Sequence, residues 1–229
     1  MANSNRVVIT GSSRGIGREL ALLLAADGCS LLLLARRARD LRSVAAQSER
    51  LGSPSVISLD ADVRSDSTPR AVRAAIDSAW DGRLDALVNN AGVYSEGPTR
   101  DVTAEELDDA WATNARGPIL ITQALLAPLR SSGGHVINIG SRSGVQGLAN
   151  EIAYCASKHA VTGFSAALRQ ELRGTGVRVS CVHPGPVNTW GATGEAARGL
   201  LSPRSVAEFL QLVLTSEAEF YDARFGLPE

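Results

Sequence analysis

The chain has 229 residues, which suits one domain with a substantial core, and 44% of them are hydrophobic. A charged fraction of 21% and a formal net charge of −1 give no indication of a nucleic-acid or membrane partner. The cysteines lie far apart and residues 1–6 lack the apolar core of a signal peptide, so we expect a cytoplasmic protein without a disulfide framework.

The first 35 residues predict a strand, a glycine-rich turn, a helix and a second strand. β-Branched residues at 7–9 indicate a buried strand, residues 18–26 favour a helix, and residues 30–35 form another apolar run. The turn reads Gly11-Ser12-Ser13-Arg14-Gly15-Ile16-Gly17. Glycines in such a turn let backbone amides approach a pyrophosphate, whose charge the helix N-terminus favours. The alternative is a turn whose glycines serve tight packing alone.

The rest of the chain continues the alternation. Further helices are expected over residues 38–51, 68–80, 103–130, 153–172 and 203–215, and further strands over 56–59, 84–89, 136–139, 177–182 and 220–227. Gly117 and Pro118 are expected to kink or divide the third of these helices just after Asn114. Residues 93–100 and 190–201 are expected to be loops, the second of which would cover a substrate. The pattern predicts one α/β domain over residues 1–229, a Rossmann-like doubly wound parallel β-sheet flanked by helices on both faces.

Several polar or glycine-rich segments follow directly after predicted strands. They are the glycine-rich turn, Arg36, Asp62, Asn90, Ser141 and Pro184. Because ligands of open parallel sheets bind beyond the carboxyl ends of the strands, we expect these segments to converge on one crevice.

Tyr154 and Lys158 lie four residues apart in a helix-favouring segment, so both are expected on one face of a helix. A phenol has an unperturbed pKa of about 10, and an ammonium one helical turn away favours the phenolate and lowers that pKa. A phenol tuned in this way can exchange a proton with an alcohol or carbonyl oxygen. The alternative is a pair on a solvated helix face, because this spacing also arises by chance.

In their order along the chain, these motifs resemble those of the short-chain dehydrogenase/reductase family, in its shorter single-domain branch. The matching motifs are Thr10-Gly-x-x-x-Gly-x-Gly17, Asp62-Val63, Asn89-Asn90-Ala91-Gly92, Asn114, Ser141, Tyr154-x-x-x-Lys158, Pro184-Gly185, Val187 and Thr189.

The resemblance implies hydride transfer between a nicotinamide C4 and a carbonyl or alcohol carbon. Tyr154 would be the acid or base, and Ser141 would bind the substrate oxygen. Lys158 would hold the nicotinamide ribose and lower the pKa of Tyr154. Asn114 would support a water beside Lys158 or, alternatively, satisfy the backbone freed by the helix kink.

The resemblance also implies the cofactor contacts, and it implies no metal. At the phosphate and adenine end they are Gly11, Ser13, Arg14, Gly15, Ile16, Gly17, Arg36, Arg37, Asp62, Val63, Asn90, Ala91 and Gly92. At the nicotinamide end they are Tyr154, Lys158, Pro184, Gly185, Val187 and Thr189. Within these sets, the Asp62 carboxylate would accept from the adenine amino group.

The end of the second predicted strand favours NADP(H) over NAD(H). Enzymes that use NAD usually place an acid there to bind the ribose 2′-hydroxyl, whereas this chain has Ala35. A 2′-phosphate would meet no anion and would find Arg36, with Arg37 and Arg14 nearby. NADP-linked members of the family more often run as reductases, so we expect a carbonyl reductase or alcohol dehydrogenase working towards reduction.

Other functions stay open at this point. A nucleotide-binding regulatory protein on the same fold would bind the cofactor without turnover. A sugar-nucleotide epimerase or dehydratase would generally need an added substrate domain, and few residues follow Thr189. His183 is interpreted as a packed or solvated residue rather than as a base. The expected partners are a small carbonyl or alcohol substrate and further copies of the chain, in a dimer or tetramer.

Overall fold

Within the described residues, 5–216 and 220–226, the computed structural model contains a parallel sheet of seven strands in the order β3-β2-β1-β4-β5-β6-β7. The strands are β1 (Arg6–Thr10), β2 (Ser30–Ala35), β3 (Val56–Asp60), β4 (Ala86–Asn89), β5 (His135–Ile139), β6 (Arg178–Pro184) and β7 (Asp222–Phe225). The predicted doubly wound parallel sheet is confirmed. The last strand is shorter than the predicted range 220–227, and residue 227 lies outside the described residues.

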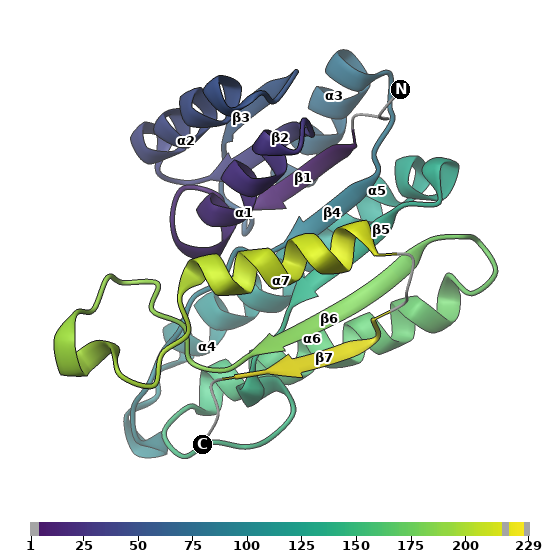
Figure 1. Cartoon of the computed structure of the whole chain (residues 1–229). Helices are drawn as coiled ribbons and strands as arrows, with labels where there is room; N and C mark the ends of the chain where they lie inside the picture. Colours follow the sequence, from purple (N-terminus) through teal and green to yellow (C-terminus); the bar gives the residue numbers. More distant parts are fainter. Residues whose placement is uncertain (1–4, 217–219, 227–229) are drawn as a thin grey trace.

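Helices cover both faces of the sheet (Figure 1). On one face lie α1 (Gly15–Ala26), α2 (Ala38–Leu51) and α7 (Pro203–Thr215), and on the other α3 (Thr68–Trp80), α5 (Gly117–Ser132) and α6 (Ile152–Glu171). Alternate side chains of β1 divide accordingly, because Val7 and Ile9 join the first layer and Val8 joins the second. Among the helices of the described ranges, none has the length and apolar character that crossing a bilayer requires.

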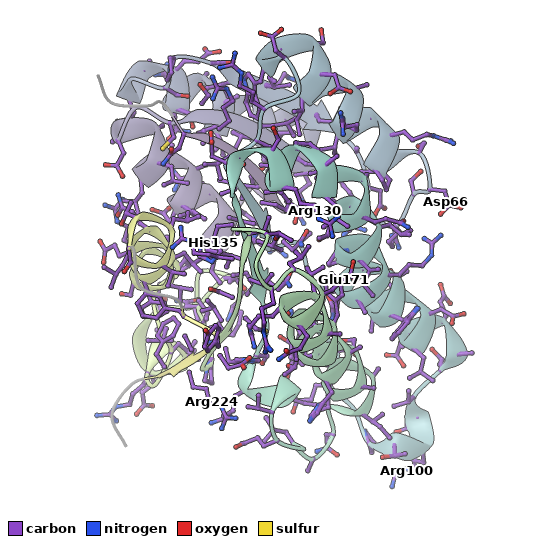
Figure 2. All side chains as sticks on the ribbon, turned by 90° about the vertical axis from the view of Figure 1, so that its right-hand side faces the viewer. Asp66, Arg100, Arg130, His135, Glu171 and Arg224 are labelled. Atoms are coloured by element: carbon purple, nitrogen blue, oxygen red, sulfur yellow. The ribbon has the colours of Figure 1, made fainter. Side chains whose placement is uncertain are left out.

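The two ends of the sheet are distinguished by the loops they carry. Strands β4 to β7 point towards the lower left of Figure 1, where the loops that follow β4, β5 and β6 gather. Figure 2 labels His135, which begins β5, above Arg224, which lies towards the end of β7. The same view labels Arg130 on α5 and Glu171 on α6, whose ion pair of 3.9 Å joins these two neighbouring helices.

The long helical region predicted before β5 is divided in the structure. α4 (Ala104–Trp111) leads into a π-helical turn, η2 (Ala112–Arg116), and α5 follows directly. The predicted division of this region is confirmed, because α5 begins at Gly117, but the irregularity starts before Asn114 and includes it rather than following it. Pro118 lies in the first turn of α5, where its missing N–H is tolerated and the helix continues.

Short helical turns lie within or at the ends of the predicted loops. The loop after β4 ends in η1 (Thr99–Asp101), and the loop after β5 begins with η3 (Arg142–Gly144). The predicted covering loop, residues 190–201, contains η4 (Gly194–Ala197).

A row of buried polar side chains crosses the layer between the sheet and the helices α5 and α6. Asn89 donates to Asn138 at 2.8 Å and to Thr122 at 3.0 Å. Asn138 donates to Ser165 at 2.9 Å, and Ser165 donates to the carbonyl oxygen of Val161 at 2.7 Å. Because buried polar groups are costly without partners, this row fixes both helices against β4 and β5.

Candidate active site

The glycine-rich turn packs tightly against the end of β4. Gly11 has a φ of 69°, and a Cβ there would lie 2.8 Å from the Cα of Ala91. A Cβ on Gly17 would lie 2.5 Å from the carbonyl oxygen of Gly11. Tight packing, the alternative reading of these glycines, therefore applies to Gly11 and Gly17. A Cβ on Gly15 would instead meet the Thr189 side chain at 3.3 Å, so the turn also adjoins the loop after β6.

The N-terminus of α1 is suited to a phosphate group. Arg14 precedes the helix in an extended conformation, with φ of −158°, and is exposed. Within the described part of the chain, no side chain caps this helix and no acid lies in its first turn. The first backbone N–H groups therefore keep their partial positive charge, as an anion site requires.

Thr10 and Asn90 join the glycine-rich turn to the end of β4. The Asn90 amide donates to the carbonyl oxygens of Thr10 at 2.8 Å and Gly11 at 3.2 Å. The buried hydroxyl of Thr10 accepts from the backbone N–H groups of Asn90 and Ala91, each at 3.0 Å. These bonds hold the glycine-rich turn on the central strands, and they occupy the Asn90 side chain with protein partners.

Arg36 and Arg37 are exposed after β2, and each has an acidic neighbour. Arg36 Nη1 lies 3.8 Å from Asp62 Oδ2, and Arg37 Nη1 lies 3.9 Å from Asp40 Oδ2. The segment after β3 thus brings the Asp62 carboxylate beside Arg36, the cation expected to bind a 2′-phosphate, and the expectation that this phosphate would meet no anion stays a prediction.

Arg64 is the main partner of Asp62. Arg64 Nη2 donates to Asp62 Oδ2 at 2.6 Å, and its Nη1 pairs with Asp109 Oδ1 at 2.5 Å. Burial acts to raise the pKa of Asp62, but the hydrogen bonds and charge of Arg64, with the charge of Arg36, lower it overall. The carboxylate is ionised at neutral pH, and its remaining lone pairs keep the predicted adenine contact possible.

Ser141, Tyr154 and Lys158 meet just beyond the end of β5. Ser141 follows that strand. Its hydroxyl accepts from the Ser143 backbone at 3.1 Å, and its side chain lowers the pKa of Tyr154. Lys158 is buried, and its ammonium donates to the carbonyl oxygen of Ile139 at 2.7 Å. The same ammonium lies 5.7 Å from the centre of the Tyr154 ring. The alternative of a pair on a solvated helix face is therefore wrong.

The protonation energetics of this group differ from the expectation. Burial raises the pKa of Tyr154, the Ser141 side chain lowers it in part, and the charge of Glu151 raises it again. Burial also lowers the pKa of Lys158 to about 8. The expected lowering of the Tyr154 pKa by Lys158 is wrong for the polypeptide alone, because burial disfavours both the phenolate and the ammonium.

A contact network around Tyr154 was not predicted from the sequence. The rings of Tyr94 and Tyr154 meet edge to face with centroids 4.9 Å apart. The Tyr94 hydroxyl donates to Glu151 at 3.1 Å, and Ser143 donates to the same carboxylate at 2.6 Å. Glu151, three residues before Tyr154, was the sequence signal that could have indicated this network. Its contact with Tyr94 depends on the fold of the loop after β4, which the sequence did not predict.

Asn114 joins the loop after β4 to α6. Its Oδ1 accepts from the N–H of Val93 at 2.8 Å, and its Nδ2 donates to the carbonyl oxygen of Val93 at 2.9 Å and to Ser157 at 2.9 Å. The alternative role of satisfying the backbone of its own helix break is wrong. A Cβ on Gly92 would lie 3.2 Å from Asn114 Oδ1 and 3.8 Å from Lys158 Nζ, so both polar groups border the same glycine.

The loop after β6 closes over the start of α1. Gly185 donates its N–H to the carbonyl oxygen of Phe225 at 2.8 Å, and Val187 forms a bridge with Leu201. His183 is 2% exposed and lies inside the fold, which confirms the expected packed histidine. The segments predicted to converge, from the glycine-rich turn to the loop after β6, are thus assembled at one end of the sheet.

Comparison with known proteins identifies the family. The model of the family described as short chain dehydrogenase matches residues 5–197. The chain belongs to the short-chain dehydrogenase family. It is therefore an oxidoreductase of CH–OH and C=O groups with a nicotinamide dinucleotide cofactor.

Proteins similar to this chain include several named as reductases or oxidoreductases. The chain is 33% identical to levodione reductase from Leifsonia aquatica over 213 residues, covering 90% of the chain and 79% of that relative. A metagenomic short-chain oxidoreductase solved in complex with NADP is 31% identical, with a TM-score of 0.84 and 98% of each chain covered. The L-sorbose reductase from Gluconobacter frateurii, solved with NADPH and L-sorbose, is 26% identical, with a TM-score of 0.90 and coverage of 97% of this chain and 95% of that one.

Proposed function

We propose that the protein is an NADP(H)-dependent carbonyl reductase, or alcohol dehydrogenase in the reverse direction, with Tyr154 as the acid and base. The observation that carries the proposal is the Lys158 ammonium 5.7 Å from the ring of the half-buried Tyr154, with Ser141 near enough to lower the pKa of that phenol. A regulatory protein without turnover would have no need for these three groups to meet.

The cofactor fit is supported by the glycine-rich turn and the N-terminus of α1. Gly11 and Gly17 let the turn pack closely against the end of β4, and the first N–H groups of α1 are left for the phosphates. Lys158 would hold the nicotinamide ribose, and Thr189 would hold the carboxamide. When bound, the reduced nicotinamide supplies the hydride.

The chain's own groups handle the oxygen of the substrate. Ser141 would donate a hydrogen bond to the carbonyl oxygen and so hold it beside Tyr154. Tyr154 would transfer its hydroxyl proton to that oxygen as charge develops there. The raised pKa of Tyr154 keeps the phenol protonated at neutral pH, which suits a proton donor for reduction. Asn114 would keep the loop after β4 in place and support a water beside Lys158.

The test of this chemistry is turnover by a Tyr154→Phe variant. NADPH oxidation is followed with a panel of ketones, aldehydes and quinones, and NADPH binding is measured in parallel. We expect a loss of at least about 100-fold in kcat with retained cofactor binding. Tyr94→Phe is the matched control, because it removes the hydroxyl from the ring that meets Tyr154 edge to face. It should change kcat by less than about threefold. Binding of NADPH without turnover of any compound by the wild type would favour the regulatory alternative.

The preference for NADP(H) is supported by three cations and by two solved relatives named as NADP or NADPH complexes. Arg14, Arg36 and Arg37 would surround a 2′-phosphate, with Arg36 exchanging its contact with Asp62 for the phosphate. We expect Arg36→Asp to lower the ratio of kcat/KM for NADPH over NADH by about 100-fold or more. Arg50→Asp at the far end of α2 is the charge-matched control, and an equal change in both variants would refute the assignment.

The proposed setting is a cytoplasmic homo-oligomer, a dimer at least. Trp111 on α4 is 50% exposed and Ile152 on α6 is 44% exposed, which leaves apolar surface beside neighbouring helices. Light scattering during size-exclusion chromatography tests this proposal, and a monomer at micromolar concentration would contradict it.

A further inference from the structure

His183 contacts the backbone that carries Ser141. Its Nδ1 lies 3.1 Å from the carbonyl oxygen of Ser141, and since a carbonyl can only accept, Nδ1 carries the hydrogen. A Cβ on Gly140 would lie 2.5 Å from the same Nδ1 and 2.7 Å from Cε1. The imidazole therefore lies directly against Gly140 and also donates to the carbonyl oxygen of Ser141. Both contacts restrain the backbone of Gly140 and Ser141.

The other side of the ring faces the edge strand. Nε2 of His183 lies 3.6 Å from Asp222 Oδ1 and has no hydrogen-bond partner among the described residues. The second oxygen of Asp222 lies 3.5 Å from Arg169 Nη1. Asp222 is paired in register with Cys181, so β7 brings the carboxylate to this position.

A metal ion is a weaker explanation of the same cluster. Donor atoms of Cys181, His183 and Asp222 lie within 4.8 Å of one another. Bonds of about 2.0–2.3 Å to zinc would hold the donors of one ion roughly 3.3–3.8 Å apart. The charges of Arg169 and Lys158 adjoin the cluster and oppose a further cation. The contacts of the ring favour a role towards Ser141.

We propose that His183 is a positioning residue that sets where the Ser141 hydroxyl stands and hence where the substrate oxygen is held relative to Tyr154. The inference rests on the proposed function of Ser141 and Tyr154. Ser141 is in an extended conformation, with φ of −169° and ψ of 162°, and its peptide carbonyl is bound on the side of β6 while its hydroxyl faces Tyr154. A misplacement of about 1 Å at such a group can lower the rate about 100-fold.

Three substitutions of His183 separate this role from simple packing. His183→Asn puts an amide N–H close to the place of Nδ1, so it can still donate to the Ser141 carbonyl oxygen. His183→Gln puts its amide one bond further out, towards the place of Nε2, and His183→Leu fills the volume without a donor. We expect kcat to fall about 10- to 100-fold in the Gln and Leu variants and to stay within about threefold in the Asn variant, with NADPH affinity unchanged in all three.

His135→Leu is the matched control. His135 is also 2% exposed, but it begins β5, whereas Ser141 follows the other end of that strand. It should lower the melting temperature without lowering kcat. Equal kcat losses in all three His183 variants, following their melting temperatures, would reduce the residue to packing and overturn the proposal. Retention of kcat within threefold by His183→Leu would overturn it as well.

Crystal structures of the His183→Leu and His183→Asn variants keep the inference separate from the proposed function. If the wild type turned over no carbonyl compound, the proposed function would be refuted. The distance between Ser141 Oγ and Tyr154 Oη in the variant structures would then decide the positioning role. We expect this separation to increase in the Leu variant and to stay unchanged in the Asn variant. An unchanged separation in both would overturn the inference.

Discussion

Thr10 offers a test of how the glycine-rich turn is fastened to the sheet. Its hydroxyl is buried and accepts two backbone N–H groups, those of Asn90 and Ala91. Thr10→Val keeps the shape of the side chain and removes this acceptor. Thr10→Ser keeps the acceptor and removes only a methyl group, so it is the matched control.

The expected size of the effect follows from which N–H group loses its partner. The N–H of Asn90 also reaches the carbonyl oxygen of Val88 at 3.1 Å, so it keeps one acceptor. The N–H of Ala91 has its bond to Thr10 and would lose it. Ala91 is half-buried, and a donor left without a partner costs about 1–3 kcal/mol, so we expect Thr10→Val to lower the free energy of unfolding by about 2 kcal/mol. For a chain of this size that is a drop in melting temperature of about 4–8 °C.

Urea unfolding followed by circular dichroism measures this difference, with NADPH affinity as a second readout. Thr10→Ser should lose about 1 kcal/mol or less, and its NADPH affinity should stay near that of the wild type. A Thr10→Val variant within 0.5 kcal/mol of the wild type, on the order of the scatter for neutral substitutions, would refute the reasoning.

Three further outcomes are expected. His135 has a pKa lowered to about 3 by burial and by the charge of Arg178, so between that value and the unfolded value near 6.5 only the unfolded chain binds the proton. Stability should therefore fall with falling pH, by up to about 1.4 kcal/mol per pH unit, and His135→Gln should flatten urea midpoints measured from pH 4 to 7. Gly17→Ala should lower the free energy of unfolding by about 1–3 kcal/mol, since its Cβ would overlap the Gly11 carbonyl oxygen. Gly163→Ala, whose Cβ meets no described atom within 4 Å, should raise that free energy by about 0.5–1 kcal/mol, and urea titration measures both. Lys158→Met should abolish turnover, yet its free energy of unfolding at pH 7 should exceed that of the wild type. Calorimetry should find this difference shrinking between pH 8 and 10.5, where Lys158 of the wild type is protonated in the unfolded chain and neutral in the folded one.

The arrangement of strands and helices was largely predictable because local signals agree with the global fold. The apolar run before the glycine-rich turn marks β1, and Gly52 and Pro203 mark the ends at which α2 stops and α7 starts. The π-helical turn at Asn114 was not predictable. It accompanies hydrogen bonds to Val93 and Ser157, which are distant in sequence.

The residue types of the site could be read from the strand ends, but their electrostatics could not. The pKa direction of Tyr154 depends on burial against the loop after β4, which has no local sequence signal. The proximity of Arg36 and Asp62 depends on the pairing of β2 with β3. The contact of His183 with Ser141 likewise requires β5 and β6 to lie side by side.

The buried row from Asn89 through Asn138 to Ser165 restricts how α6 can move along its own axis. A slip of one residue would turn Ser165 by about 100° away from the sheet and leave an amide in an apolar layer without its acceptor. Tyr154 and Lys158 belong to the same rigid helix. These buried side chains thus set the height of Tyr154, the proposed proton donor, above the strand ends.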